Sequence, residues 1–448
     1  MTISKFYSTM YVDASSYDNL RKIASVTDGL KNSGRKVLST VMDKNIKSEV
    51  KVSRLKSTVS EHTEYLHGED NLSDVIVNMA RRYTGSNNLP LMRDEGNFGK
   101  RFINNASADR YISTAGESYI NYLFPKVDNN ILVEQVFEGV KIEPRFFIPV
   151  VPMLLVNGSP AAVSSGFKQV ILPRPLNQII KATEKYIETG EIKIPKPGWA
   201  GFKGTVTQDK DNKRKWIVRG KFKRINTTTL EILEVPVGVE LKKYQMKLDD
   251  LVENKIISSY EDKCENNIFN FKVRVSRKFM EMTDEEILQA LGLVDKGVNF
   301  VELYAIMGSD NRMDIVNTPE DIFKLYASVR EEYYVKRKEY LVTNTIKEIK
   351  ALASKFFFIK GVTEDTITIN KKSKAQVLKQ IEPIANIITD EEGSYDYLLR
   401  MPIYSLTTEK MDELKQSIKD KKFLLTEYKE KDPTEFWKED LEILKSHI

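Results

Sequence analysis

Apolar residues between positions 15 and 85 recur every three or four residues, in short series interrupted by Gly29 and Gly34. This is the spacing of one face of an amphipathic helix. The series are Leu20, Ile23, Val26 and Leu30, then Val37, Leu38 and Val41, and finally residues 71–79 (NLSDVIVNM). The pattern predicts several short helices.

The middle of the chain has three other patterns. Residues 93–112 contain Gly96, Gly99 and several Asn and Asp residues, which predicts a hairpin or wing followed by a loop. Residues 145–175 are apolar but interrupted by prolines and glycines, so we expect buried loop or short strands. Between residues 200 and 236, apolar and polar positions alternate, which predicts a small antiparallel sheet.

The last third is predicted to be helical, because no Gly or Pro occurs between Pro319 and Gly361. One heptad-like series is Val335, Val342, Ile346, Ile349, Ala353 and Phe356, and another is Met411, Leu414, Ile418, Leu425 and Tyr428, with a gap at Lys421. Two such runs fit an antiparallel coiled-coil arm with a small cap at its tip. An ordinary helix pair in a bundle has the same periodicity and stays an alternative.

Length and composition narrow the class of protein. The 448 residues are enough for about three domains. The longest apolar stretch, residues 146–156, is too short to span a bilayer, and the N-terminus has no apolar signal segment. The single cysteine rules out an intramolecular disulfide framework and a thiolate metal cluster, and three histidines argue against a histidine-rich metal site. We therefore expect a cytoplasmic protein without a membrane partner and without a metal site of its own.

The charge is concentrated in two segments, although the whole chain carries only +5. Residues 21–56 contain ten Lys and Arg against three acidic residues, and residues 203–224 contain nine against two, so each segment carries +7. We call them the first and second basic segments. They are suited to binding a phosphate backbone, but solvated lysine-rich faces would give the same count.

Arg110 and Tyr111 are the residues that could carry chemistry. They follow one another in the polar segment 106–111 (ASADRY). A phenol is a weak nucleophile at its usual pKa near 10, and an adjacent cation that stabilises phenolate and the phosphate transition state would activate it towards a phosphodiester. Among 20 tyrosines, an Arg-Tyr pair can also be a structural accident.

The surrounding strings resemble motifs of the type IIA DNA topoisomerases, in family order. Residues 94–99 (DEGNFG) resemble DGQGNFG, and residues 106–112 (ASADRYI) resemble the active-site string ASARYI with one inserted residue. Four further segments are similar to DGLKPxxRRVL, YHHGE, IPxxLxNG and YLLxMPxxSLT: residues 28–38 (DGLKNSGRKVL), 65–69 (YLHGE), 148–158 (IPVVPMLLVNG) and 397–407 (YLLRMPIYSLT).

The resemblance implies a multidomain α+β fold. We expect a winged-helix DNA-binding and cleavage domain at residues 1–165, a sheet-bearing tower domain at 166–300, and a long antiparallel coiled coil with a C-terminal dimer gate at 301–448. The length, and an end soon after the second coiled-coil helix, look most like the medium, DNA-cleaving subunit of tailed-phage (T-even-type) heteromeric topoisomerases. Gyrase A subunits carry a further C-terminal domain.

The resemblance also implies roles for single residues. Tyr111 would be the nucleophile that holds the 5′ end of the cut strand, Arg110 would stabilise the phosphate, and His67 and Arg21 would lie near the scissile phosphate. The residues expected to contact DNA are Lys31, Arg35, Lys36, Asn97, Val163 as a possible intercalating wedge, Lys213, Arg214 and Lys215. Three structural alternatives remain: His67 could cap a turn, the lysines and arginine of 31–36 could form a solvated face, and Val163 could belong to the core.

The expected function is cleavage and religation of double-stranded DNA within an ATP-dependent type II topoisomerase. The sequence has no GxxxxGK[ST] phosphate-binding loop, so ATP and Mg²⁺ are expected on a separate large subunit, while this chain forms a homodimer through its C-terminal arm. If the chain is phage-encoded, the location would be the host cytoplasm. A non-catalytic DNA-bending scaffold and a coiled-coil interaction protein are the alternatives.

Overall fold

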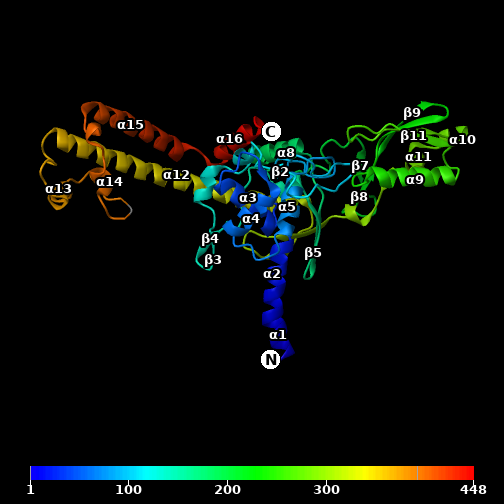
Figure 1. Cartoon of the computed structure of the whole chain (residues 1–448), viewed down its shortest axis with the longest axis horizontal. Helices are drawn as coiled ribbons and strands as arrows, with labels where there is room; N and C mark the ends of the chain where they lie inside the picture. The colour runs from blue at the N-terminus through cyan, green and yellow to red at the C-terminus, as the bar shows by residue number, and fades with distance from the viewer. Residues whose placement is uncertain (1, 391) are drawn as a thin grey trace. The chain divides into compact units, whose positions relative to one another are not determined.

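The computed structural model describes residues 2–390 and 392–448, in two units (Figure 1). The first unit contains residues 1–330 and 437–448, and the second contains residues 331–436. The mixed α+β fold class predicted from the sequence is confirmed, whereas the three domain ranges stay predictions.

The first described helix starts before the region in which the apolar pattern predicted helices. It consists of α1 (Ile3–Phe6), a π-helical turn η1 (Tyr7–Tyr11) and α2 (Val12–Lys22). Among its described residues, Asn19 alone is buried, and Figure 1 shows the helix leading away from the rest of the first unit.

Residues 15–85 contain the helices α2, α3 (Asn32–Asp43), α4 (Val52–His62) and α5 (Asp70–Ala80). The second and third predicted apolar series lie in α3 and α5, whereas Leu20 is the one member of the first series in a helix, because α2 ends at Lys22 and a turn segment follows. α3 and α5 each pack an apolar face into the core, which Val37, Leu38 and Leu72 help to form with almost no exposed surface. A two-residue strand β1 (Val50–Lys51) precedes α4 and pairs antiparallel with β2 (Ser113–Thr114), so the segment after Tyr111 is fixed beside the start of α4.

Residues 93–112 contain no regular helix or strand, so the predicted hairpin or wing is absent from them and only the predicted loop is present. An isolated bridge between Glu95 and Ser113 holds the base of this loop. After it come α6 (Ile120–Leu123), the 3-10 turn η2 (Lys126–Asn130) and a hairpin of β3 (Gln135–Phe137) and β4 (Val140–Ile142).

Residues 145–175 are buried loop and strand, as predicted, with one short helix, α7 (Met153–Val156), that the prolines did not indicate. The strands β5 (Ser159–Ser164) and β6 (Phe167–Ile171) form a hairpin. They join β14 (Leu303–Met307) and β15 (Met313–Ile315) in a four-stranded sheet of order β15-β14-β6-β5.

The sheet predicted for residues 200–236 is two sheets, which corrects the prediction of one. A three-stranded sheet has the order β13-β8-β7, and a four-stranded sheet has the order β11-β12-β10-β9. The chain passes from one to the other at Gly220, where a Cβ atom would lie 2.2 Å from the carbonyl oxygen of Glu234. A residue with a side chain does not fit so close to a neighbouring backbone, so glycine is required at the point where β8 ends and β9 begins.

These sheets and the helices around them have the following bounds. The strands are β7 (Thr205–Gln208), β8 (Trp216–Arg219), β9 (Lys221–Asn226), β10 (Thr229–Glu234), β11 (Ser259–Asp262), β12 (Phe271–Arg274) and β13 (Val294–Asp295). The helices are α8 (Leu176–Thr189), α9 (Leu241–Glu253), α10 (Arg277–Met280), α11 (Asp284–Ala290) and the 3-10 turn η3 (Val298–Phe300).

The helix predicted between Pro319 and Gly361 is the 45-residue α12 (Pro319–Thr363). Within the second unit it runs antiparallel to α15 (Thr408–Glu430). The Lys338 ammonium donates to the carbonyl of Lys431 (2.7 Å), Glu348 pairs with Lys421 (2.5 Å), and the Lys415 ammonium lies 5.7 Å from the Phe356 ring centroid. As one residue number rises the other falls, so the antiparallel arm is present.

A small cap closes the arm, as expected. It contains α13 (Lys374–Ile381), α14 (Asp396–Leu399) and the 3-10 turn η4 (Ile403–Ser405), around an apolar cluster that includes Phe358 and Leu398. The predicted heptad register on α12 is wrong at its start. Val335 is 45% exposed, whereas the neighbouring Tyr334 and Arg337 are buried, so the buried face of the helix departs from the predicted register there. The last helix, α16 (Pro433–Lys445), ends in the first unit, where the Trp437 indole donates to the carbonyl of Val150 (2.9 Å).

Candidate active site

The loop that leads to Tyr111 is fixed by its own backbone. At Gly99 (φ +90°), a Cβ atom would lie 2.4 Å from the carbonyl oxygen of Asn104, so the loop closes on itself only with glycine there. The Arg81 guanidinium donates to the carbonyls of Phe98 (3.0 Å) and Asn104 (2.8 Å). The backbone N–H of Ser107 donates to the carbonyl of Asn97 (2.9 Å), which joins the two sides of the loop.

Tyr111 itself is 68% exposed at the end of this loop. The Arg110 guanidinium lies over its ring, 5.0 Å from the centroid. The Lys51 ammonium donates to the backbone carbonyl of Tyr111 (3.3 Å), next to the start of α4. The phenol is thus open to a large substrate and has a cation beside it, as a nucleophile towards a phosphate requires.

Asp109, the residue inserted into the motif, anchors the loop to two helices. Its carboxylate pairs with Lys56 of α4 (2.7 Å) and accepts from the Ser73 hydroxyl of α5 (3.0 Å). The Lys56 hydrogen bond holds the pKa of Asp109 below its usual value. Only one residue lies between this anchor and Tyr111.

A cationic pocket of about 290 Å³ lies elsewhere in the first unit. Its lining includes Arg21, Lys36 and His67, together with Tyr17 and Tyr65. Residues 64–67 follow the C-terminal end of α4, whereas Tyr111 lies beside the N-terminal end of the same helix. Arg110 and Tyr111 are not among the lining residues, so one copy of the chain does not gather all four predicted catalytic residues in one pocket.

His67 is held by aromatic neighbours. Its Nε2 atom is 3.0 Å from the Tyr17 hydroxyl, and the Tyr65 ring packs against it edge-on at 5.4 Å between centroids. Burial lowers the pKa of His67 below its usual value, and the charges of Arg21 and Lys36 lower it further. The imidazole is therefore neutral near pH 7, and it is not a simple turn cap.

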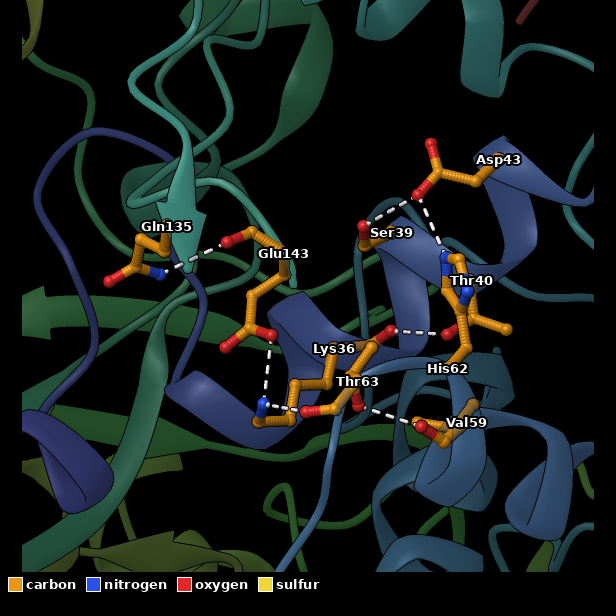
Figure 2. A network of polar contacts seen from close by, with 9 residues as sticks. All are labelled: Lys36, Ser39, Thr40, Asp43, Val59, His62, Thr63, Gln135 and Glu143. Carbon is orange, nitrogen blue, oxygen red and sulfur yellow. Dashed lines mark hydrogen bonds and ion pairs between the residues drawn. The ribbon is translucent and has the colours of Figure 1, made fainter. Parts of the chain in front are cut away.

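Lys36 was predicted to contact DNA, but the structure gives it an internal role (Figure 2). Its ammonium, in a side chain 9% exposed, pairs with Glu143 (2.8 Å) and donates to the carbonyl of Thr63 (2.6 Å). Burial raises the pKa of Glu143, even though Lys36 opposes the shift. Because a buried carboxylate requires its cation, Lys36 joins α3 to the end of α4 and to the segment after β4.

Arg35 also forms an internal ion pair, and its contact with DNA stays a prediction. Its guanidinium pairs with the fully buried Asp28 (2.7 Å), whose carboxylate also accepts from the backbone N–H groups of Leu30 (2.9 Å) and Phe147 (3.1 Å). Arg35 thus stabilises the turn that contains Gly29. Lys31 is half-buried, which lowers the pKa of its ammonium, and neither a solvated face nor a fully exposed DNA contact describes residues 31–36.

The other predicted DNA contacts lie at the surface. Val163 is 64% exposed near the tip of the β5–β6 hairpin, so the alternative that it belongs to the core is wrong. Asn97 and Lys213 are exposed. The Arg214 guanidinium lies 5.5 Å from the Tyr304 ring centroid and donates to Asn317 (3.3 Å), and the Lys215 ammonium lies 3.8 Å from a carboxylate oxygen of Asp209.

The described residues do not fit a metal ion. Within residues 2–390 and 392–448, no three His, Cys, Asp or Glu side chains are grouped closely enough to hold one. In that same part of the chain, no helix is long and apolar enough to cross a membrane.

Comparison with known proteins places this geometry in a family. The family model that describes the A subunits of DNA gyrase and topoisomerase IV matches residues 21–442. The chain belongs to this family.

The chain is similar to DNA topoisomerases of two named organisms. The chain is 30% identical over 441 residues to the mitochondrial DNA topoisomerase 2 of Dictyostelium discoideum (96% of this chain, 34% of that protein) and 29% identical over 486 residues to human DNA topoisomerase 2-alpha (98% and 31%). It thus spans about a third of the length of these relatives. A crystal structure of the Plasmodium falciparum topoisomerase II DNA-binding, cleavage and re-ligation domain matches with a TM-score of 0.88 at 28% identity, over 99% of this chain and 64% of that one.

Sequence reasoning missed three residues that organise this family member's site. Tyr17 lies one helical turn before Arg21, and this spacing could have indicated that both face one pocket. In the sequence, Asp109 could be recognised only as the residue inserted into the ASARYI-like string, and nothing indicated that it contacts Lys56 and Ser73. Glu143 is 107 residues from Lys36, and nothing local in the sequence indicates that they meet.

Proposed function

We propose that this chain is the DNA-cleavage and religation subunit of an ATP-dependent type II DNA topoisomerase. The observation that carries the proposal is the exposed Arg110–Tyr111 pair at the end of a loop that Asp109 and Arg81 anchor. The family supports it, and so do relatives named DNA topoisomerase 2.

The proposed reaction is a reversible phosphoryl transfer. The Tyr111 phenol loses its proton and its oxygen bonds to the phosphorus of a backbone phosphodiester, while the bond from phosphorus to the 3′ oxygen breaks. That oxygen takes up a proton, and the 5′ phosphate stays on Tyr111. Arg110 stabilises the phenolate and the charge on the phosphate. Attack of the 3′ hydroxyl on the phosphotyrosine reverses each step and religates the strand.

The cationic pocket is proposed to act with Tyr111 of a second copy. Because Tyr111 does not line the pocket of its own chain, Arg21 and His67 reach a scissile phosphate only if two copies meet on the DNA. A homodimer through the C-terminal arm provides this arrangement, and it places two tyrosines for the two strands. Around the cut, Lys31, Asn97, Lys213, Arg214 and Lys215 contact DNA, and Val163 is the wedge at a base step.

Mg²⁺ and ATP are assigned to a partner. Because the described residues do not fit a metal ion, the metal ligands are proposed to lie on a separate large subunit that also binds ATP. This division is that of the tailed-phage heteromeric topoisomerases, and we propose that the chain is a medium subunit of that kind.

The test is Tyr111→Phe in the chain reconstituted with its large subunit. Only the nucleophilic oxygen is lost, so covalent 5′-phosphotyrosyl adducts should disappear while the affinity for duplex DNA stays within about twofold, since affinity comes from many phosphate contacts. The control is Tyr404→Phe, which removes the hydroxyl of a tyrosine that is 83% exposed in the arm cap and should leave adducts unchanged.

Adducts in the Tyr111→Phe protein would assign the nucleophile to another residue. Tight DNA binding without adducts in the unchanged complex would favour the non-catalytic scaffold.

A further inference from the structure

Ten residues before Tyr111, the loop is bound to the sheet β11-β12-β10-β9. The guanidinium of Arg101 and the carboxylate of Glu234, at the end of β10, form a two-armed ion pair in which Nη1 donates to Oε2 (3.1 Å) and Nη2 donates to Oε1. Nη2 also donates to the carbonyl of Val235 (3.2 Å). The Arg101 and Glu234 side chains are 9% and 2% exposed, so this ion pair is buried away from water.

Aromatic packing strengthens the same contact. The Arg101 guanidinium lies 4.9 Å from the ring centroid of Phe269, and the Phe102 ring packs edge-on against Phe269 at 4.9 Å. The backbone N–H of Leu241 donates to the carbonyl of Phe102 (3.3 Å). Two consecutive loop residues are therefore embedded in the sheet's apolar core, to which Phe269 belongs.

The strand next to β10 carries exposed cations of the second basic segment. β9 pairs antiparallel with β10, with Lys221 opposite Glu234 and Lys223 opposite Glu231. Lys221 and Lys223 are exposed, whereas Glu234 also accepts from the backbone N–H of Lys203 (3.1 Å). One carboxylate thus ties together the start of the second basic segment, the strand beside β9 and the tyrosine loop.

On the other side, the loop is continuous with the cleavage residues. Arg81 holds the carbonyl of Asn104, and Asp109 is fixed to Lys56 and Ser73, one residue from Arg110. Separating Arg101 from Glu234 would leave two buried, uncompensated charges, so the loop is expected to follow the strand when β9 and β10 shift.

We propose that Arg101 is a positioning residue that couples contact between DNA and β9 to the placement of Tyr111 for cleavage. The proposal rests on the proposed function, since it concerns the efficiency of that reaction. Duplex DNA that binds Lys221 and Lys223 displaces β9 and the paired strand β10. The ion pair between Glu234 of β10 and Arg101 then moves the loop with the strand. Cleavage then depends on DNA flanking the cut, and not only on DNA at the cut.

The test uses duplexes lengthened in steps of about 10 base pairs, one helical turn, with the reconstituted complex. The unchanged protein should form a larger fraction of covalent adducts once the flanking duplex is long enough to reach β9, and this increase is the gain that is measured. Arg101→Met should reduce that gain by roughly 2- to 30-fold, the range measured for residues that couple two sites. Lys221→Gln with Lys223→Gln should reduce the same gain, and all three substitutions together should reduce it no further. Arg101→Lys, which keeps one charged hydrogen bond, should restore part of it.

The control is Arg330→Met, which removes another buried cation, paired with Asp128, outside the loop and the sheet. If Arg101 has only a structural role, Arg101→Met and Arg330→Met will both lower cleavage by the same factor at every length, and the proposal is overturned. If Arg101→Met does not fold, Glu234→Gln tests the same pair.

Hydrogen exchange separates this proposal from the proposed function. If the unchanged complex makes no adduct on any duplex, the proposed function fails. The coupling is still measured by the protection of residues 99–109 on binding long and short duplexes. Greater protection with the long duplex, lost in Arg101→Met, supports the coupling, and equal protection overturns it.

Discussion

The two basic segments have the same net charge and different structures. Both carry +7, yet in the first segment Arg35 and Lys36 are buried and paired with Asp28 and Glu143. In the second segment Lys213, Lys221 and Lys223 are exposed on a turn and a strand. Equal net charge therefore includes buried, paired cations in the first segment and exposed cations on a turn and a strand in the second.

The difference lies in the partners, which a local count of charge does not include. α3 is packed on the rest of the first unit, and its cations meet carboxylates contributed by the preceding turn and by residue 143. β9 is at the edge of its sheet, so within the described part of the chain one side of it has no neighbouring strand. A cluster of cations thus predicts nucleic-acid binding only where the fold leaves it at a surface.

The largest expected effect is on stability, from Lys36→Met. Loss of the ammonium leaves Glu143 buried without its cation, which should lower the free energy of unfolding by about 3–5 kcal/mol. Chemical denaturation of the isolated chain measures it. Lys36→Met combined with Glu143→Met should recover much of the loss, because the pair is then replaced by apolar side chains.

The matched control is Lys44→Met, an exposed cation of the same segment, with an expected change within about 0.5 kcal/mol. If Lys36→Met instead leaves stability unchanged and makes DNA binding less dependent on salt, the two segments do not differ as described.

The next effect is on the salt dependence of DNA binding, from the combined substitutions Lys213→Gln, Arg214→Gln and Lys215→Gln. If each cation neutralises one phosphate, the slope of log binding constant against log salt concentration becomes shallower by about 2.7. Over a fourfold rise in salt, the loss of affinity is then about 40-fold smaller than in the unchanged protein. Fluorescence titration of a labelled duplex measures the slope. Among the single substitutions, Lys213→Gln should change the slope most. Arg214 also contacts Asn317 and Lys215 also contacts Asp209, so these two cations are less available to phosphate.

The comparison triple is Lys371→Gln, Lys372→Gln and Lys379→Gln, three exposed lysines of the arm cap with the same change in charge. It should leave the slope nearly unchanged. An equal effect of both triples would mean that net charge alone, and not the place of the second basic segment, sets the salt dependence.

The smallest effect concerns the titration of His67 in the first segment's pocket. Burial and the nearby cations lower its pKa, so without DNA the ring should titrate below about 6.5 when followed by NMR. Since the unfolded chain takes up this proton at a higher pH than the folded chain, His67 costs stability as the pH falls below about 6.5. Arg21→Gln should move the midpoint upward, whereas Lys22→Gln, an adjacent cation paired with Asp18, should not. A titration midpoint of His67 above 6.5 would contradict the description of this pocket as cationic and partly buried.

The sequence predicted features that depend on local periodicity and on motifs. The helices α3, α5 and α12 and the loop before Tyr111 are present, because spacing, glycine content and the absence of Pro act locally, whereas the hairpin predicted within residues 93–112 is not. The strings around Tyr111 indicated the family, which is confirmed. The roles of Tyr111, Arg110, His67 and Arg21 stay predictions.

Features that depend on distant partners could not be predicted. The burial of Lys36 requires Glu143, and the division of the predicted sheet requires Glu234 to approach Gly220. The register of α12 failed at Val335 because Tyr334 and Arg337 are buried beside it, and heptad analysis does not assign an arginine to a buried position.

The small buried area of α15 has a consequence for local unfolding. Among the described residues of α15, Leu414 alone is buried, and Phe423 is 75% exposed. Little apolar surface is therefore exposed to water when the two helices separate, so the opening free energy of the arm should lie well below that of global unfolding. Amide hydrogens of α15 should exchange long before those of α3, and the arm can part and close again while the core of the first unit stays folded.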